Sequence, residues 1–225
     1  MKKALLLVIF CIVALGYWGW KKSDTSMTVV LPEKSVFFID QDLSKTFKKN
    51  IEKSIQKSYS QSKNPAQVIE QATAKYPEIS SMKVQICQSD KICFYVEAPE
   101  PVFLLNGQEV VCENATAAKK DHFDSEVVQK LVAVICKKVD QLQTMVDFVQ
   151  VLPEKFKQEF LIEWGNDQDI LLQPKDGKDC ILQASIQTVP SLQDLTYCQV
   201  IGSTSKTKKK RMVYDLRFKN QIIVR

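Results

Sequence analysis

Cysteine is the residue type with the clearest capacity for chemistry in this chain of 225 residues. Apart from Cys11, which lies in an apolar amino-terminal stretch, the cysteines form an even set. An even set behind an export-type segment favours disulfides in an oxidising compartment. The alternative is that they are reduced thiols packed as small hydrophobic side chains. Zinc is less favoured, because the chain has no C-x-x-C pair. The set comprises Cys87, Cys93, Cys112, Cys136, Cys180 and Cys198.

A disulfide is expected between Cys87 and Cys93, which flank a short turn between two predicted strands. Paired strands would bring their Cα atoms within the roughly 4.4–6.8 Å that a disulfide requires. So small a loop would stabilise the fold by only about 2 kcal/mol. The other four cysteines allow three pairings, of which we name the one that joins Cys180 to Cys198 and Cys112 to Cys136.

Other catalytic chemistry has few candidates. His122 is the single histidine and lies in a polar stretch, so we expect a surface side chain. The sequence has only six glycines, and it contains no motif for a phosphate loop, a dinucleotide-binding site or a nucleophile elbow. Paired carboxylates occur in turn-like loops without the spacing of an EF-hand. They are Asp167 with Asp169 and Asp176 with Asp179. The sequence therefore predicts no enzyme, no cofactor, no metal site and no small-molecule substrate.

Positive charge is concentrated at two places in a chain whose formal net charge is +5. Lysine pairs flank the amino-terminal apolar stretch, and a second basic cluster runs from Lys206 to Arg211. A nucleic-acid-binding protein would spread basic residues over one face with aromatic residues between them, so nucleic acid is not an expected partner. The 206–211 cluster is predicted to be a solvated loop, with contact to anionic lipid or to an acidic partner as the alternative.

The uncharged run from Ala4 to Trp20 predicts a helix that crosses a membrane. At about 1.5 Å per residue it spans roughly 25 Å, near the short limit for a bilayer core. Its final aromatic residues suit an interfacial belt, and no small-residue cleavage pattern follows it. A cleaved signal peptide and a buried core helix are the alternatives. We expect residues 1–22 to hold a cytoplasmic start and a transmembrane helix, with the lipid bilayer contacted through residues 4–20.

A first domain is predicted over residues 35–99, after a polar linker at 23–34. A short strand at 35–39 is followed by a helix whose apolar residues recur every four positions from Leu43 to Tyr59. Asn64 and Pro65 supply an N-cap and a first-turn proline for a second helix. Alternation over 82–86 and 92–96 then predicts a β-hairpin.

A second, mostly antiparallel β domain is predicted over residues 100–225. Asn106-Gly107 is a strong signal for a type I′ hairpin. Residues 125–148 have helical periodicity and predict one long helix, or one broken near Cys136. Strand-like segments follow, residues 190–199 are either helix or strand, and a hairpin over 211–225 closes the chain. The predicted fold class is α+β, with a single N-terminal transmembrane helix, a β-α-α-β-β domain and this β domain.

Three segments resemble the FtsQ/DivIB family of bitopic bacterial cell-division proteins. They are YPEISSMKV at 76–84, VEAPEPVFLLNGQEVV at 96–111 and VYDLRFKNQIIVR at 213–225. The last is the most specific, because an Asp-Leu-Arg-aromatic run, a short turn and an apolar strand close the β domain across that family. The order of elements is also similar, since the family has one transmembrane helix, a POTRA domain of strand, two helices and two strands, and then a mostly β domain. This chain differs by its six later cysteines, which are not a family trait.

The resemblance implies a non-catalytic, membrane-anchored scaffold of the cell-division machinery at the septum of the bacterial inner membrane. Its amino terminus would be cytoplasmic and its later domains exported. Its partners would be membrane-anchored division proteins of the FtsB/FtsL type. The alternatives are a POTRA-bearing envelope protein that handles exported polypeptides, and a small disulfide-stabilised secreted enzyme or inhibitor.

The resemblance also implies a partner site on the carboxy-terminal hairpin. In the family the terminal strand receives a partner by β-augmentation, in which backbone pairing gives affinity and alternate side chains give selectivity. Residues 221–224 carry neither the charge nor the proline that usually blocks an open edge. A closed strand that only completes the sheet is the alternative. The expected partner-binding residues are Phe218, Asn220, Gln221, Ile222, Ile223, Val224 and Arg225.

Overall fold

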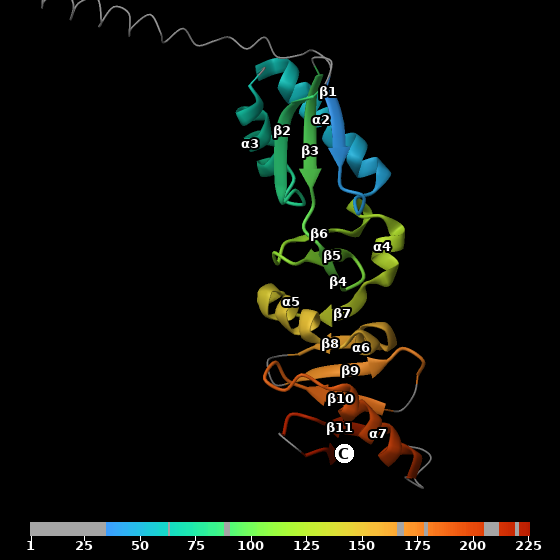
Figure 1. Cartoon of the computed structure of the whole chain (residues 1–225). Coiled ribbons are helices and arrows are strands. Elements are labelled where there is room, and N and C mark those ends of the chain that lie inside the picture. The colour runs from blue at the N-terminus through green and yellow to red at the C-terminus, as the bar shows by residue number, and fades with distance from the viewer. Residues whose placement is uncertain are drawn as a thin grey trace, which may run out of the picture. The chain divides into compact units, whose positions relative to one another are not determined.

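Two β-sheets, one of three strands and one of nine, organise the part of the chain that the structure describes (Figure 1). The computed structural model describes residues 35–62, 64–87, 91–165, 169–177, 180–204, 212–218 and 221–225. Residues Lys34–Arg225 form one compact unit. The predicted division into domains over 35–99 and 100–225 therefore stays a prediction, although each sheet falls within one of those ranges.

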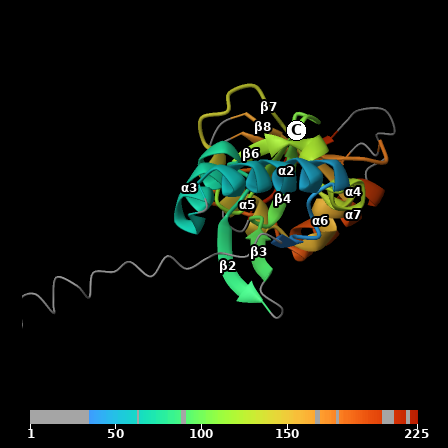
Figure 2. The ribbon, with the colours of Figure 1, turned by 90° about the horizontal axis from the view of Figure 1, so that it is seen from above.

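The first sheet follows the predicted order of strand, two helices and hairpin. Its central strand is β3, which is parallel to β1 and antiparallel to β2. The two helices pack against each other (Figure 2). The elements are β1 (Ser35–Ile39), α2 (Lys45–Ser62), α3 (Pro65–Lys75), β2 (Ser81–Cys87) and β3 (Lys91–Glu97).

Local sequence explains both helices. The apolar face of α2 is buried at helical spacing, with Ile51 and Ile55 almost fully covered. α3 begins where predicted, because the Asn64 side chain accepts a hydrogen bond of 3.0 Å from the Ala66 N–H and Pro65 occupies the first turn. The Tyr59 ring of α2 meets the buried Phe94 ring of β3 edge-on at 5.8 Å, so this face packs on the sheet.

The second sheet is mixed, and five of the eight pairs among its described strands are antiparallel, so the prediction of a mostly antiparallel domain is confirmed. Its order is β12-β11-β10-β9-β8-β7-β4-β5-β6. The pairs β4/β7, β7/β8 and β10/β11 are parallel, and the other described pairs are antiparallel. The strands are β4 (Pro101–Leu105), β5 (Glu109–Cys112), β6 (Ala117–Lys119), β7 (Val132–Cys136), β8 (Phe160–Trp164), β9 (Ile170–Pro174), β10 (Cys180–Ala184), β11 (Met212–Asp215) and β12 (Ile223–Val224).

The prediction of one long or broken helix over 125–148 is wrong. The segment forms α4 (Ser125–Lys130), then strand β7, then α5 (Leu142–Val151). The run VAVIC in β7 is short, and its buried residues alternate with more exposed ones, which suits a strand better than a helix. β7 lies between the parallel strands β4 and β8, and this non-local pairing decides its conformation.

The remaining helices lie between strands of the second sheet. They are η1 (Lys120–His122), α6 (Glu154–Glu159) and α7 (Leu192–Thr204). α7 shows that residues 190–199, which the sequence left open between helix and strand, are largely helical. The Asn106-Gly107 hairpin between β4 and β5 is confirmed, since both residues have positive φ, 48° and 70°.

The predicted transmembrane architecture requires a correction. No helix in the described ranges is long and apolar enough to cross a membrane. The proposed span at residues 4–20 lies outside those ranges. The described residues have an α+β fold, and the single N-terminal transmembrane helix that we expected is not among them.

The first sheet and the second are joined by contacts around η1. The Asp124 N–H donates to the Asp42 carbonyl at 2.8 Å, and the Ser44 N–H donates to the His122 carbonyl at 2.8 Å. The His122 ring stacks on Phe47 of α2, with ring centroids 4.1 Å apart. His122 Nδ1 lies 2.7 Å from the buried Glu78 carboxylate. The single histidine is thus a half-buried junction residue rather than the surface side chain we predicted.

Candidate functional site

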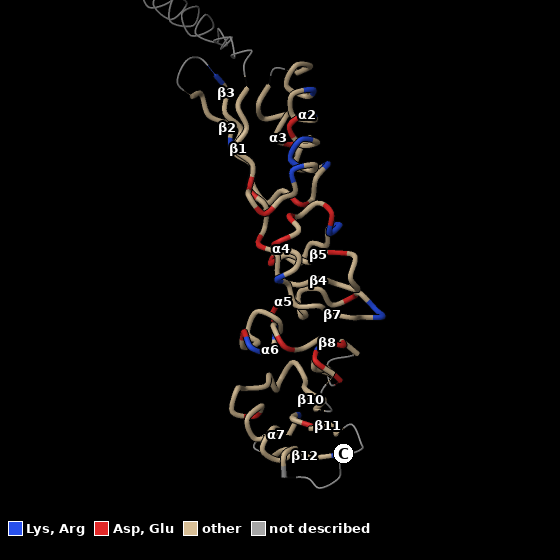
Figure 3. Tube along the Cα trace, turned by 90° about the vertical axis from the view of Figure 1, so that its right-hand side faces the viewer, with Lys and Arg blue, Asp and Glu red and all other residues tan. Residues whose placement is uncertain are grey.

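β12 is the outermost strand at one end of the nine-stranded sheet (Figure 3). It pairs antiparallel with β11, with Tyr214 opposite Val224 and Asp215 opposite Ile223. No other described strand pairs with the outer side of β12. An edge of this kind presents backbone N–H and C=O groups to which a further strand can bind.

The hydrogen-bond register shows which backbone groups face outward. Val213 and Arg225 exchange both backbone hydrogen bonds, at 3.2 and 3.0 Å. In an antiparallel ladder such pairs alternate with pairs that do not exchange bonds. Ile223 therefore directs its N–H and C=O toward β11, whereas the N–H and C=O of Val224 point to the open side.

A charged cluster around Asp215 attaches β12 to the sheet. The Asp215 side chain is 0% exposed and binds two guanidinium groups. Arg217 donates to both carboxylate oxygens, at 2.9 and 2.7 Å, and Arg225 approaches at 2.9 Å. The Arg217 guanidinium also forms an ion pair with the Asp169 carboxylate, at 3.0 Å. The Asp-Leu-Arg run of the family resemblance thus positions Arg225, the residue that directly follows the edge strand β12.

These contacts also change the acidity of the cluster. Hydrogen bonding from the Arg217 side chain lowers the pKa of Asp215 below its ordinary value, and the positive charges of both arginines act in the same direction. The pKa of Arg217 is raised by the same hydrogen bond. Asp215 is therefore ionised at neutral pH, and the buried carboxylate is compensated by charge on both sides.

Exposed apolar side chains surround the edge. Phe218 is 45% exposed, Ile223 37% and Val224 43%. Tyr214 and Leu216 are buried, whereas Phe218 lies beyond the end of β11 and is exposed. An apolar cluster beside a free sheet edge is typical of a protein-binding surface.

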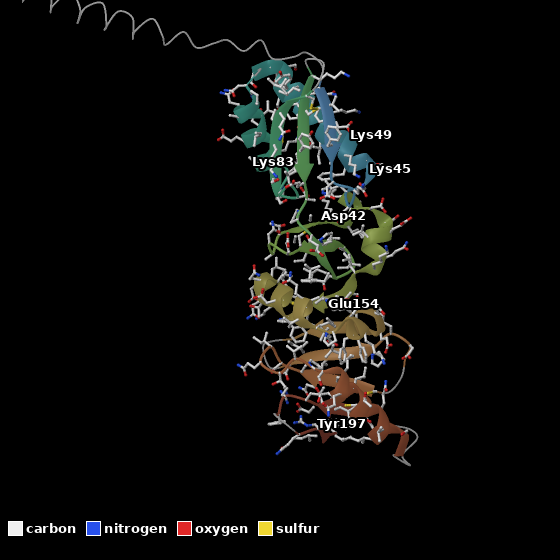
Figure 4. All side chains as sticks on the ribbon, viewed as in Figure 1. Asp42, Lys45, Lys49, Lys83, Glu154 and Tyr197 are labelled. Atoms are coloured by element: carbon white, nitrogen blue, oxygen red, sulfur yellow. A yellow bond between two sulfur atoms is a disulfide. The ribbon has the colours of Figure 1, made fainter. Side chains whose placement is uncertain are left out.

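A hollow of about 530 Å³ lies next to this cluster. Phe218, Leu216 and Ile222 line it from the terminal hairpin, and Asp194 and Tyr197 line it from α7. Tyr197 projects from α7 in Figure 4 and is 50% exposed. Sequence reasoning missed this contribution because the conformation of residues 190–199 could not be assigned, so the position of Tyr197 near the edge was not foreseeable.

The predicted partner-binding residues are only partly brought together. Gln221 and Ile222 reach the hollow, while Ile223, Val224 and Arg225 form the edge. Asn220 lies outside the described residues, as does the basic cluster at 206–211.

The cysteines divide into one disulfide and four free thiols. Cys87 and Cys93 form the predicted disulfide, with Cα atoms 5.9 Å apart. A bridge between Cys112 and Cys136 is wrong, because β4 separates their strands and they lie at its opposite ends. Two strand spacings of about 4.8 Å already exceed the reach of a disulfide. The expected bridge between Cys180 and Cys198 is also wrong, because both are free thiols, one on β10 and the other on α7, which packs against it.

The described ranges contain no candidate metal site. No group of three or more His, Cys, Asp or Glu side chains is placed to hold a metal ion there. Of the paired carboxylates considered above, Asp167 and Asp179 lie outside those ranges. Asp169 instead binds Arg217 and accepts a hydrogen bond of 2.8 Å from Gln183.

No protein-family model matches the chain, and no curated protein matches it.

Proposed function

We propose that this chain is a non-catalytic scaffold that binds an extended segment of a partner protein by β-augmentation at β12. The observation that carries the proposal is the open outer side of β12, held in place by the Asp215 cluster and bordered by exposed Phe218, Ile223 and Val224. The partner's backbone would pair with the outward groups of Val224. Its side chains would meet Phe218 and the adjoining hollow, which would give selectivity.

We further propose that the partner belongs to the bacterial cell-division machinery. The support is the resemblance of residues 213–225 to the end of FtsQ/DivIB proteins, together with the β-α-α-β-β order of the first sheet. A septal location outside the cytoplasm is part of the same proposal. The disulfide between Cys87 and Cys93 supports an oxidising compartment, where such bonds persist.

Proline at position 224 tests the edge directly. Val224→Pro removes the N–H that faces the open side, and proline is tolerated on edge strands. We expect partner capture to fall roughly tenfold, while thermal unfolding of the free protein changes little. Val224→Ala is the matched control, because it shortens the side chain and keeps the donor. Ile223→Pro removes a donor directed at β11 and should instead weaken folding.

Capture is best measured in living cells that produce the protein. A photo-crosslinking phenylalanine analogue in place of Phe218 would label whatever lies beside the edge, and mass spectrometry would identify it. A division protein crosslinked in the alanine variant and lost in the proline variant is the expected result. Equal crosslinking in both variants contradicts β-augmentation. A crosslinked protein with no part in division contradicts the division role and leaves the edge proposal standing.

A further inference from the structure

A second hollow, distant in the fold from β12, lies between α2, α3 and η1. Its volume is about 550 Å³. Phe47, Tyr76 and His122 supply aromatic surface, and three lysines border it. Lys53 and Lys57 come from α2, and Lys75 comes from the last turn of α3.

The lysines at this hollow lack acidic partners among the described residues. Lys75 donates to the neutral Ser54 hydroxyl at 3.0 Å and lies 4.9 Å above the Tyr76 ring. The side-chain ammonium groups of Lys53 and Lys57 make neither an ion pair nor a hydrogen bond with any described group. α2 as a whole carries five lysines and one glutamate, so the charge is not compensated along the helix. Like charges one helical turn apart destabilise a helix, so the repulsion between Lys53 and Lys57 lowers the stability of α2.

The one carboxylate that lines the hollow does not neutralise these lysines. Glu78 is buried and lies 2.7 Å from His122 Nδ1, and it forms no ion pair with Lys53, Lys57 or Lys75. The hollow therefore combines uncompensated positive charge with aromatic surface. Such a combination attracts an anion that also has an apolar part.

We propose that this hollow binds an acidic peptide segment of a partner protein, in which carboxylates alternate with apolar residues. Lys53 and Lys57 are separated by one helical turn, about 6 Å. Alternate residues of an extended peptide are about 6.6 Å apart on one face. Two carboxylates at that spacing match the two ammonium groups, and the apolar residues reach Tyr76 and Phe47. The lysines border a concave surface from two helices, which suits a peptide better than a flat bilayer.

A labelled peptide tests the proposal on the purified full chain. The probe is a fluorescein-labelled octapeptide in which Glu alternates with Leu, and the measurement is fluorescence anisotropy. We expect saturable binding that weakens with added salt. The double variant Lys53→Glu with Lys57→Glu should weaken binding at least about tenfold, since two ion pairs become two repulsions.

The matched control changes the same charge on the same helix. Lys45 and Lys49 are exposed on α2 and do not line the hollow (Figure 4). Lys45→Glu with Lys49→Glu should change affinity less than about threefold. Thermal unfolding of each variant confirms that the fold is kept.

Three results would overturn the proposal. If both double variants lose the same peptide affinity, binding depends only on the net charge of α2 and not on the hollow. If a peptide with Gln in place of Glu binds as tightly as the Glu peptide, the carboxylates do not contribute to binding. Absence of peptide binding, with vesicles containing phosphatidylglycerol bound through Lys53 and Lys57, assigns the surface to anionic lipid.

Discussion

Asp215 is the residue on which the candidate edge depends most. It is fully buried, and it links β11 to Arg225 at the end of β12. A buried carboxylate is tolerable only when it is paired and hydrogen-bonded, and Arg217 and Arg225 together meet that requirement. The conspicuous Asp-Leu-Arg run is therefore explained by structure alone, whatever partner the edge binds.

A pH dependence follows from the lowered pKa of Asp215. A carboxyl whose pKa is lower in the folded state stabilises the fold above its unfolded pKa, about 3.9, and this contribution is lost as pH falls through the folded pKa. Asp215→Asn should lower the free energy of unfolding by about 2 kcal/mol at pH 7. The difference from the wild type should shrink below about pH 4. Urea unfolding across pH measures it, and a constant difference down to pH 2 would contradict the assignment.

The free thiols are protected by burial. Desolvation raises the pKa of Cys112 to about 12 and that of Cys198 to about 12, so both remain protonated at pH 8. Iodoacetamide should therefore leave both unmodified in the folded protein and modify both in urea. Peptide mapping without a reducing agent should find Cys87 and Cys93 still bridged. Equal labelling rates of Cys112 with and without urea would show that β5 is not packed as described.

At the scale of elements, the β4–β5 hairpin depends on one glycine. Gly107 has φ of +70°, and a Cβ there would meet no atom within 4 Å, so any cost is conformational. Gly107→Ala should lower the free energy of unfolding by about 1 kcal/mol. Gly107→Asn should cost less, because asparagine tolerates positive φ. Urea unfolding of both variants tests this, and equal losses would mean that the turn rearranges.

β7 shows how an element can differ from its local signal. Its flanks, α4 and α5, are helical, so a helical period can be drawn through the whole segment. Within β7 the buried residues Val132, Val134 and Cys136 alternate and face the core beside Phe148 and Trp164. Tertiary pairing with β4 and β8 overrides the helical reading.

At the scale of the whole molecule, the contacts around η1 join the two sheets into one unit. Phe123 is buried there and forms an isolated bridge with Leu43. We expect a single cooperative unfolding transition, in which amides of β3 and β8 lose protection at the same urea concentration in hydrogen exchange. Phe123→Ala should lower the free energy of unfolding by about 3 kcal/mol, so that the amides of β3 and those of β8 lose protection at different urea concentrations. Separate midpoints in the wild type would contradict one unit.

Short-range features were determined by the sequence itself. The spacing of apolar residues along α2, the Asn64-Pro65 helix start, the Asn106-Gly107 turn and the proximity of Cys87 to Cys93 all depend on residues a few positions apart. Within that range, backbone sterics and side-chain periodicity restrict the chain to a single outcome.

Long-range features were decided only by the tertiary structure. One such feature is the placement of β7 between β4 and β8. Another is the ion pair of Arg225 with Asp215, which joins two strands. A third is the pairing of His122 with Glu78, which are 44 positions apart. A short apolar run is compatible with a strand or a buried helix, and local pattern does not specify its partner. These contacts form because the complete core must bury its apolar area and compensate each buried charge at once.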